Sequence, residues 1–260
     1  MDNTIPLAGK HALVTGGGRG IGGAIAGALL EQGACVTIAG RDESSLQQTV
    51  RQLLPRGKIN YVIVDVADLK SVQQAFEHAT VRLGRIDILV NNAGQARSAP
   101  FHKTDETLWG QMLAVNLTGT FYCTQQVLPA MLTAGWGRVV NIASTAGLAG
   151  YAYVSAYCAA KHGVIGLTRS LAMEVASKGV TVNAVCPGYT ETDIVREAIA
   201  NIVSKTGRSE EQARTELASA NPQKRLVQPD EVANAVAWLC LPAAAAMNGQ
   251  AIAVAGGEVM

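Results

Sequence analysis

Short apolar runs alternate with longer helix-like segments along almost the whole chain. Seven runs of strand length are predicted, at residues 11–16, 34–40, 59–65, 86–94, 137–144, 179–188 and 250–256. Helices are predicted at 20–32, 43–54, 68–82, 105–134, 153–177 and 229–241, and residues 190–222 look partly helical without a strand. Strands that are apolar throughout are buried on both faces of their sheet. The alternation therefore predicts an α/β fold with a doubly wound parallel sheet of about seven strands, covered by helices on both faces.

Length and composition indicate one well-buried domain. The chain has 260 residues, of which 48% are hydrophobic and 16% charged, so a single domain over residues 1–260 is the simplest interpretation. Net charge is +1 with no basic cluster, which argues against nucleic acid or an anionic membrane as partner. No apolar run reaches the roughly 18 residues of a membrane span.

The cysteines, the histidines and the N-terminus indicate a cytoplasmic protein without a metal. The five cysteines are scattered and odd in number, as expected of small buried residues in a reducing compartment rather than of disulfides. The four histidines are isolated, so no metal site is expected. The first residues lack the charged and apolar regions of a signal peptide.

The first predicted strand runs directly into a glycine-rich loop, TGGGRGIG, at residues 15–22. Gly16, Gly20 and Gly22 immediately precede a helix, where bare backbone can approach a pyrophosphate and the helix N-terminus supplies oriented N–H groups. An ordinary glycine-rich turn would give the same pattern. Its place at the first strand–helix junction favours a Rossmann-type dinucleotide site.

The end of the second strand indicates which dinucleotide binds. NAD-binding folds usually carry an acidic residue there for the ribose hydroxyls, but this chain has Gly40 followed by Arg41. Arg41, with Arg19 from the glycine loop, could pair with the 2′-phosphate of NADP(H), although both could be solvated surface charges. Asp42 is close enough to keep NAD(H) possible. NADP(H) is the preferred cofactor.

Two further strand ends could contact the cofactor. Asp65 ends the third strand, beside Val66, and could accept a hydrogen bond from the adenine amino group, or equally cap a turn. The stretch NNAG, residues 91–94, ends the fourth strand and could line the cofactor with backbone and amide groups, or form a polar turn.

Tyr157 and Lys161 are four residues apart in the stretch SAYCAAKHG, and so share one face of a predicted helix. A nearby ammonium favours the phenolate, and bringing a tyrosine pKa from about 10 toward neutrality requires about 3–4 kcal/mol. Tyr157 could then exchange a proton with a substrate oxygen. Taken alone, the pair would be better explained as part of an ordinary amphipathic helix.

These motifs occur together and in order, with Asn116 in VNLTG, Ser144 after the fifth strand and the pair Pro187–Gly188 after the sixth. The chain resembles the short-chain dehydrogenase/reductase family, in its compact branch of about 250 residues, over essentially its whole length. One departure is Ala143, where many relatives carry a second serine.

The resemblance implies a catalytic role for four residues. Ser144 would hydrogen-bond the substrate oxygen, and Tyr157 would be the general acid in reduction and the general base in oxidation. Lys161 would bind the nicotinamide ribose and lower the tyrosine pKa, and Asn116 would hold a water in a proton relay. The resemblance also implies cofactor contacts by Thr15, Gly16, Gly20, Ile21, Gly22, Asn92, Gly94, Pro187, Gly188 and Thr192. Relatives commonly pair the helices at 105–134 and 153–177 across subunits, so a homotetramer is expected.

The substrate is expected at the carboxyl end of the sheet, between segments 95–101, 146–154 and a lid at 189–222. Candidate substrate contacts are Gln95, Ser144, Tyr151, Tyr153 and Tyr189. In the lid, Lys205, Arg208 and Arg214 could receive an acidic tail, or be helix-surface charge.

Reduction of a 3-oxoacyl thioester, bound to coenzyme A or a carrier protein, is the favoured activity. Interconversion of another ketone and secondary alcohol is the alternative, and a non-catalytic nucleotide-binding regulator is a remote one. A sugar epimerase or dehydratase of the longer branch of the family is a poor match to this chain. Members of that branch have well above 300 residues and a G-x-x-G-x-x-G loop.

Overall fold

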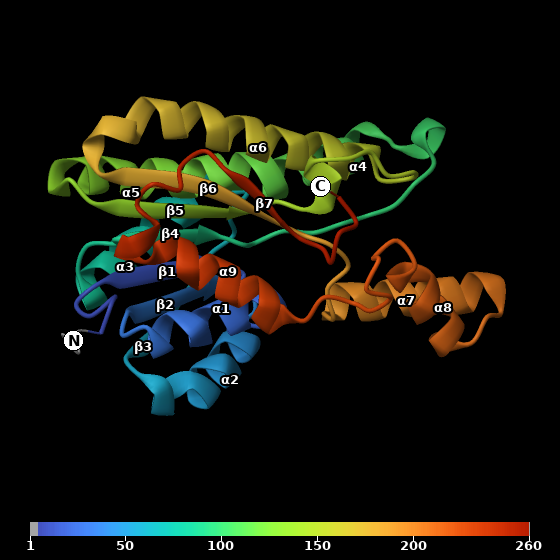
Figure 1. Cartoon of the computed structure of the whole chain (residues 1–260), viewed down its shortest axis with the longest axis horizontal. Coiled ribbons are helices and arrows are strands. Elements are labelled where there is room, and N and C mark those ends of the chain that lie inside the picture. Colours follow the sequence, from blue (N-terminus) through green and yellow to red (C-terminus); the bar gives the residue numbers. More distant parts are fainter. Residues whose placement is uncertain (1–4, 260) are drawn as a thin grey trace.

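The computed structural model describes residues 5–259, which fold around one parallel sheet (Figure 1). The strand order is β3-β2-β1-β4-β5-β6-β7, and every neighbouring pair is parallel. The strands are β1 (His11–Thr15), β2 (Cys35–Gly40), β3 (Ile59–Ile63), β4 (Ile88–Asn91), β5 (Gly137–Ile142), β6 (Val180–Pro187) and β7 (Ala251–Val254). The strand order reverses between β1 and β4, which is where doubly wound folds bind nucleotides. The seven-stranded doubly wound fold predicted from the sequence is confirmed.

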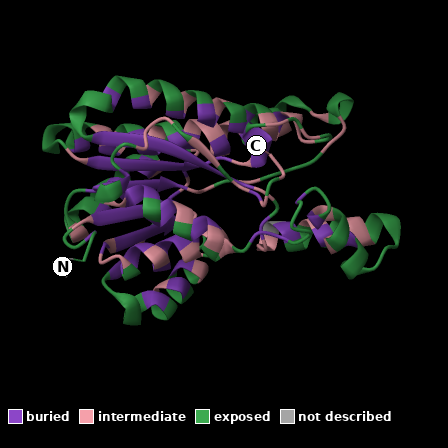
Figure 2. Ribbon diagram, viewed as in Figure 1, coloured by how far each residue is buried: buried purple, intermediate pink, exposed green. Residues whose placement is uncertain are grey.

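Helices cover both faces of the sheet. One layer contains α1 (Gly20–Glu31), α2 (Glu43–Leu53) and α9 (Pro229–Cys240). The other contains α3 (Leu69–Leu83), α4 (Glu106–Leu113), α5 (Gly119–Ala134) and α6 (Ser155–Val175). In β1, Ala12 and Val14 join the apolar cluster under the first layer, whereas Leu13 joins the cluster under the second. This two-sided burial, visible as the buried sheet in Figure 2, is why the strands are apolar at every position.

The helix predicted at 105–134 is divided into α4 and α5 by a π-helical turn at Ala114–Thr118. Asn116 lies in this turn and is buried. Its side-chain Nδ2 donates a hydrogen bond to the carbonyl of Met112 at 3.0 Å, which satisfies a backbone acceptor where the helical register widens. The prediction of one uninterrupted helix was wrong, and the wider turn is centred on a predicted site residue.

The fourth strand is shorter than predicted, ending at Asn91 rather than at residue 94. The reason is local, because the backbone N–H groups of Asn92 and Ala93 both donate to Thr15 Oγ1, each at 3.0 Å, and leave the ladder. In the predicted NNAG segment, Asn91 is thus the last strand residue and residues 92–94 form a loop. Other predicted strand ends also extend into loops by one or two residues.

Beyond the carboxyl edge of the sheet, two helices form a separate pair, α7 (Asp193–Thr206) and α8 (Glu210–Ala218) (Figure 1). They have a small apolar cluster of their own, which contains Val195, Ile199 and Ala213. A parallel bridge between Thr190 and Val227 closes the base of this excursion. Helices without a regular strand were predicted here. Within residues 5–259, no helix combines the length and apolarity needed to cross a membrane.

Candidate active site

The glycine loop between β1 and α1 is shaped by close contacts that only glycine permits. Gly16 and Gly20 have φ angles of 65° and 52°, in the left-handed region that other residues avoid. A Cβ added at Gly22 would lie 2.2 Å from the Gly16 carbonyl oxygen and 2.5 Å from the Asn92 side-chain amide. These glycines therefore let α1 start directly against the ends of β1 and β4.

The N-terminus of α1 suits a phosphate group. Arg19, the residue before the helix, makes an ion pair with Asp193 at 3.5 Å and does not cap the helix with its side chain. The helix is 12 residues long, and Ile21 lies in its first turn. Its first N–H groups and partial positive charge face the loop, where the three glycines keep the backbone bare. The predicted cradle for a pyrophosphate thus fits the loop that is present.

Thr15 and Asn92 fix this loop from two sides. Thr15 Oγ1 accepts two backbone hydrogen bonds from the β4 end, and the Asn92 Nδ2 donates to the carbonyls of Thr15 at 3.0 Å and Gly16 at 3.2 Å. Both residues were predicted as cofactor contacts. The structure places their polar atoms inside the protein, where they position the loop.

At the end of β2, the Asp42 carboxylate is held by hydrogen bonds within the protein. Asp42 is the N-cap of α2, and its Oδ1 accepts from the amides of Ser44 and Ser45 and from the Ser44 hydroxyl. The Ser44 hydroxyl is the main reason that the Asp42 pKa is lowered. Arg41 is exposed beside it. A polar hollow of about 620 Å³, lined in part by Gly18, Arg19, Asp42 and Ser44, lies next to the glycine loop.

Asp65 takes the turn-capping role that was one of its two predicted roles. Its Oδ1 accepts from the backbone N–H of Ala67 at 3.0 Å, and its own N–H donates to Ser71 Oγ. Val66 is buried against α5, since a Cβ added at Gly119 would lie 2.8 Å from its Cγ2.

Tyr157, Lys161, Ser144 and Asn116 converge at the carboxyl end of β4 and β5. Lys161 Nζ is 5.7 Å from the Tyr157 ring centroid and donates to the carbonyl of Ile142, the last residue of β5, at 2.8 Å. Ser144 follows that strand closely, and burial raises the pKa of Tyr157 while a hydrogen bond with the Ser144 hydroxyl opposes that rise. The serine, the tyrosine and the lysine thus share one small region.

Gly94 connects this region to Asn116. A Cβ at Gly94 would lie 2.9 Å from Asn116 Oδ1 and 3.7 Å from Lys161 Nζ. The Asn116 side chain accepts from the Gln95 N–H at 3.2 Å and donates to the Gln95 carbonyl at 2.9 Å. The Asn116 side chain therefore holds the loop after β4. The water that was predicted to bind Asn116 would have to contact a different atom of this residue.

Burial dominates the electrostatics of the central pair. It raises the pKa of the Tyr157 phenol, against the lowering effect of the Ser144 hydroxyl. It also lowers the pKa of Lys161 to about 8, because this residue is only 4% exposed. Among the protein's own groups, Lys161 is not a main cause of the Tyr157 shift. The lowered tyrosine pKa that the sequence predicts therefore calls for a second positive charge, such as an oxidised nicotinamide.

The three predicted substrate tyrosines differ in position. Tyr151 Oη donates to the carboxylate of Glu258. Burial, and after it the nearby Glu258 carboxylate, raises the pKa of Tyr189. Tyr153 has a φ of 68° and is 67% exposed, and its carbonyl accepts from the Ala99 N–H, which ties together the loops after β4 and β5. No sequence signal pointed to Glu258, because it lies beyond the last strand.

The segment after β6 lies against the glycine loop. Pro187 is the last residue of β6, and Gly188 donates to the Val254 carbonyl of β7 at 3.1 Å. Thr192 precedes α7, and its Cγ2 would be 3.4 Å from a Cβ at Gly20. Of these three predicted cofactor residues, Thr192 therefore lies against the loop that would hold the pyrophosphate, whereas Pro187 and Gly188 lie at the end of β6 beside β7.

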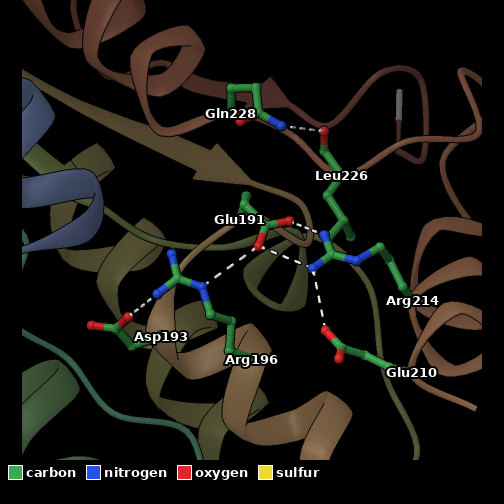
Figure 3. Close-up of polar contacts among 7 residues, drawn as sticks. All are labelled: Glu191, Asp193, Arg196, Glu210, Arg214, Leu226 and Gln228. Atoms are coloured by element: carbon green, nitrogen blue, oxygen red, sulfur yellow. Dashed lines mark hydrogen bonds and ion pairs between the residues drawn. The ribbon is translucent and has the colours of Figure 1, made fainter.

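A network of ion pairs holds the base of α7 and α8 (Figure 3). Glu191 lies between Arg196 and Arg214, and Arg214 also reaches Glu210. Asp193 contacts Arg196, which extends the network to Arg19 of the glycine loop. Arg214 is therefore neutralised within the protein.

Arg208, on the same helical pair, is also paired, with Glu216. Both arginines match the surface-charge alternative better than an acidic-tail receptor.

A family model described as short chain dehydrogenase matches residues 10–203. The 3-oxoacyl-acyl-carrier-protein reductase of Vibrio cholerae is 41% identical over 254 residues, which are 98% of this chain and 99% of that protein. The D-beta-hydroxybutyrate dehydrogenase of Cupriavidus necator is 38% identical over 97% of this chain and 99% of its own. A solved structure of a variant actinorhodin polyketide ketoreductase with NADPH superposes with a TM-score of 0.92, at 39% identity, over 96% of this chain and 97% of that one.

Proposed function

We propose, from the premise that the chain belongs to the short-chain dehydrogenase family, that this oxidoreductase is an NADPH-dependent reductase of 3-oxoacyl thioesters. The substrate would be carried by coenzyme A or a carrier protein, and the reverse reaction would oxidise a 3-hydroxyacyl group. The observation that carries the proposal is the convergence of Ser144, Tyr157 and Lys161 at the end of β5, beside Gly94 of the loop that follows β4.

The residues present fit the cofactor that the family implies. Gly16, Gly20 and Gly22 with the N-terminus of α1 would hold the pyrophosphate, and Gly188 with Thr192 would lie near the nicotinamide. NADPH, when bound, supplies a hydride to the carbonyl carbon.

The chain's own residues would then control the substrate oxygen and its proton. Ser144 would donate a hydrogen bond that orients the carbonyl. Tyr157 would donate its phenolic proton to the oxygen in reduction and accept it back in oxidation. Lys161, buried and pointing at the end of β5, would keep a positive charge near the phenol and bind ribose hydroxyls. Asn116 would position the Gln95 loop and so the wall of the site.

The test is a reduction assay over a panel of substrates. We expect loss of NADPH absorbance with acetoacetyl and longer 3-oxoacyl thioesters, on both pantetheine and carrier-protein conjugates. Faster reduction of simple ketones than of any thioester would favour the alternative, an alcohol dehydrogenase or ketone reductase of another substrate. Absence of turnover with intact NADPH binding would favour a regulator.

Cofactor preference gives a sharper prediction at Arg41. We expect higher kcat/KM with NADPH than with NADH, because Arg41 is exposed at the end of β2 and the Asp42 carboxylate is occupied by the cap of α2. Arg41→Ala should lower kcat/KM with NADPH about 10- to 100-fold, as for a lost charge-assisted hydrogen bond, and leave NADH nearly unchanged. Arg51→Ala, an exposed arginine on α2, is the control. Equal losses with both cofactors would exclude Arg41 as the phosphate contact.

We propose further that the enzyme is cytoplasmic. We also propose that α7 and α8 form the substrate lid at 189–222. The ion pairs at the base of this helical pair, including Asp193 with Arg19, link it to the glycine loop. That link supports a lid whose position responds to the cofactor end of the site.

We also expect a homotetramer, since α4, α5 and α6 expose Trp109, Phe121 and Met173. Phe121→Glu should dissociate the assembly, because burying a carboxylate at an apolar interface is unfavourable by several kcal/mol. Leu54→Glu, at another exposed apolar residue after α2, should leave it intact. Sedimentation at micromolar protein measures both, and a monomeric wild type would contradict the prediction.

A further inference from the structure

The chain after β7 brings a carboxylate into the region assigned to the substrate. Gly256 and Gly257 have φ angles of 61° and 95° and turn the backbone back toward the sheet. A Cβ at Gly256 would lie 2.2 Å from Asn221 Oδ1, so the turn is packed closely against the segment that follows α8. Glu258 therefore follows a turn that packs against the segment after α8.

The Glu258 carboxylate is held between two segments of the site. Tyr151, on the loop that follows β5, donates its hydroxyl to Oε1. A Cβ added at Gly188, after β6, would lie 2.8 Å from Oε2. The Thr145 hydroxyl, next to Ser144, also influences the pKa of Tyr151, and Tyr189 influences the pKa values of both Tyr151 and Tyr157. Glu258 is thus connected to the catalytic region through its immediate neighbours.

No cation balances this carboxylate among residues 5–259. The ion pairs there involve the other acidic residues, such as Glu191 with Arg196 and Arg214, but none involves Glu258. Its one recorded side-chain partner is a neutral phenol, and burial together with Glu258 raises the pKa of that phenol, Tyr151, to about 12. Glu258 is partly exposed, and a charge at this position would be screened by water less than one on the open surface.

We propose that Glu258 is a specificity-determining residue that rejects free 3-oxo acids and admits neutral 3-oxoacyl derivatives, with Tyr151 orienting its carboxylate. The inference rests on the proposed function, because it assumes a 3-oxoacyl group beside Ser144. A thioester or amide places no charge near Glu258, whereas the carboxylate of a free acid would meet a like charge. The same fold can in this way separate carrier-bound substrates from their hydrolysed acids.

The experiment compares acetoacetate with acetoacetamide, which has nearly the same shape but no charge. We expect Glu258→Gln to raise the ratio of kcat/KM for acetoacetate to that for acetoacetamide about tenfold, or ~1.4 kcal/mol. The rise should come from acetoacetate. Glu77→Gln, which removes an exposed carboxylate on α3, should leave the ratio unchanged. A ratio in Glu258→Gln within twofold of wild type would overturn the proposal.

Calorimetric Kd values in the NADP⁺-saturated protein separate this inference from the proposed function. They require no turnover, and Glu258→Gln should tighten acetoacetate relative to acetoacetamide by a similar factor. If the wild type reduces no 3-oxoacyl compound but this shift appears, the proposed function fails and the role of Glu258 stands. If thioesters are reduced but the shift is missing, or neither ligand binds, Glu258 does not read substrate charge. A Tyr151→Phe variant, which keeps the carboxylate but loses the hydrogen bond that orients it, should discriminate against acetoacetate less strongly than the wild type and more strongly than Glu258→Gln.

Discussion

Tyr157→Phe is expected to lower kcat by about 10²–10⁴-fold while leaving NADPH affinity almost unchanged. The change deletes only the phenolic hydroxyl and keeps the ring, which is half-buried on α6 and packed beside Ser144 and Lys161. Without the hydroxyl, no group at that position can donate the proton to the substrate oxygen. Ser144 and Lys161 remain in place, so the cofactor side of the site should be intact.

The measurements are steady-state reduction of an acetoacetyl thioester and fluorescence titration with NADPH. Tyr122→Phe, a partly buried tyrosine on α5, makes the same chemical change outside the site and should behave as wild type. Retention of more than about a tenth of wild-type kcat in Tyr157→Phe would mean that another group carries the proton. Loss of NADPH binding would instead show that the hydroxyl supports the cofactor.

The pH dependence of alcohol oxidation tests where the tyrosine shift originates. Burial raises the pKa of Tyr157 within the protein, so binding of positively charged NADP⁺ has to lower it if the phenolate is to form near neutral pH. An oxidation rate that rises through an apparent pKa well below 10 in the enzyme–NADP⁺ complex, with a higher phenol pKa in the protein alone, would agree with this division of roles.

The fold was readable from the sequence because two-sided burial leaves a strong signal. Leu13 and Val14 are both apolar since each meets a different helical layer, and the same logic holds along every central strand. Strand ends were less readable. By sequence, Asn92 fits either a strand or a turn. Its place outside the strand depends on a hydrogen bond to the hydroxyl of Thr15, which is 77 positions away in the sequence.

Candidate site residues could be predicted from the sequence where the local geometry of a position allows a single residue type. Gly16, Gly20 and Gly22 are such cases, because the backbone angles and the close approach of α1 exclude larger side chains. Asn116 could be named as a candidate from its motif, but the π-helical turn around it and its hydrogen bonds to Gln95 depend on tertiary contacts. Glu258 had no local signal, because its meaning comes from a turn against Asn221 that no short-range pattern encodes.

Lys161→Met is expected to lose both turnover and NADPH affinity. The buried ammonium lies next to Tyr157 and Gly94, where it would act on the phenol and on the nicotinamide ribose. Methionine keeps most of the volume of the side chain and removes the charge. We expect kcat to fall by at least about 10²-fold, with a weaker Kd for NADPH by fluorescence titration, which distinguishes this variant from Tyr157→Phe.

The same substitution should change how stability depends on pH. Burial lowers the Lys161 pKa to about 8, whereas in the unfolded chain a lysine titrates near 10.4. Between these values the unfolded state binds a proton that the folded state does not, so the penalty for burying the ammonium, complete below about pH 8, is relieved as pH rises.

This sign makes the stability prediction testable by urea unfolding from about pH 7.5 to about pH 10.5. Relative to Lys161→Met, the free energy of unfolding of the wild type should rise by ~3 kcal/mol across that range, at about 1.36 kcal/mol per pKa unit. Loss of the hydrogen bond to the Ile142 carbonyl shifts the variant by a constant amount and does not alter the slope. A flat difference would mean that Lys161 titrates alike in both states, and that burial alone does not poise this ammonium beside the phenol.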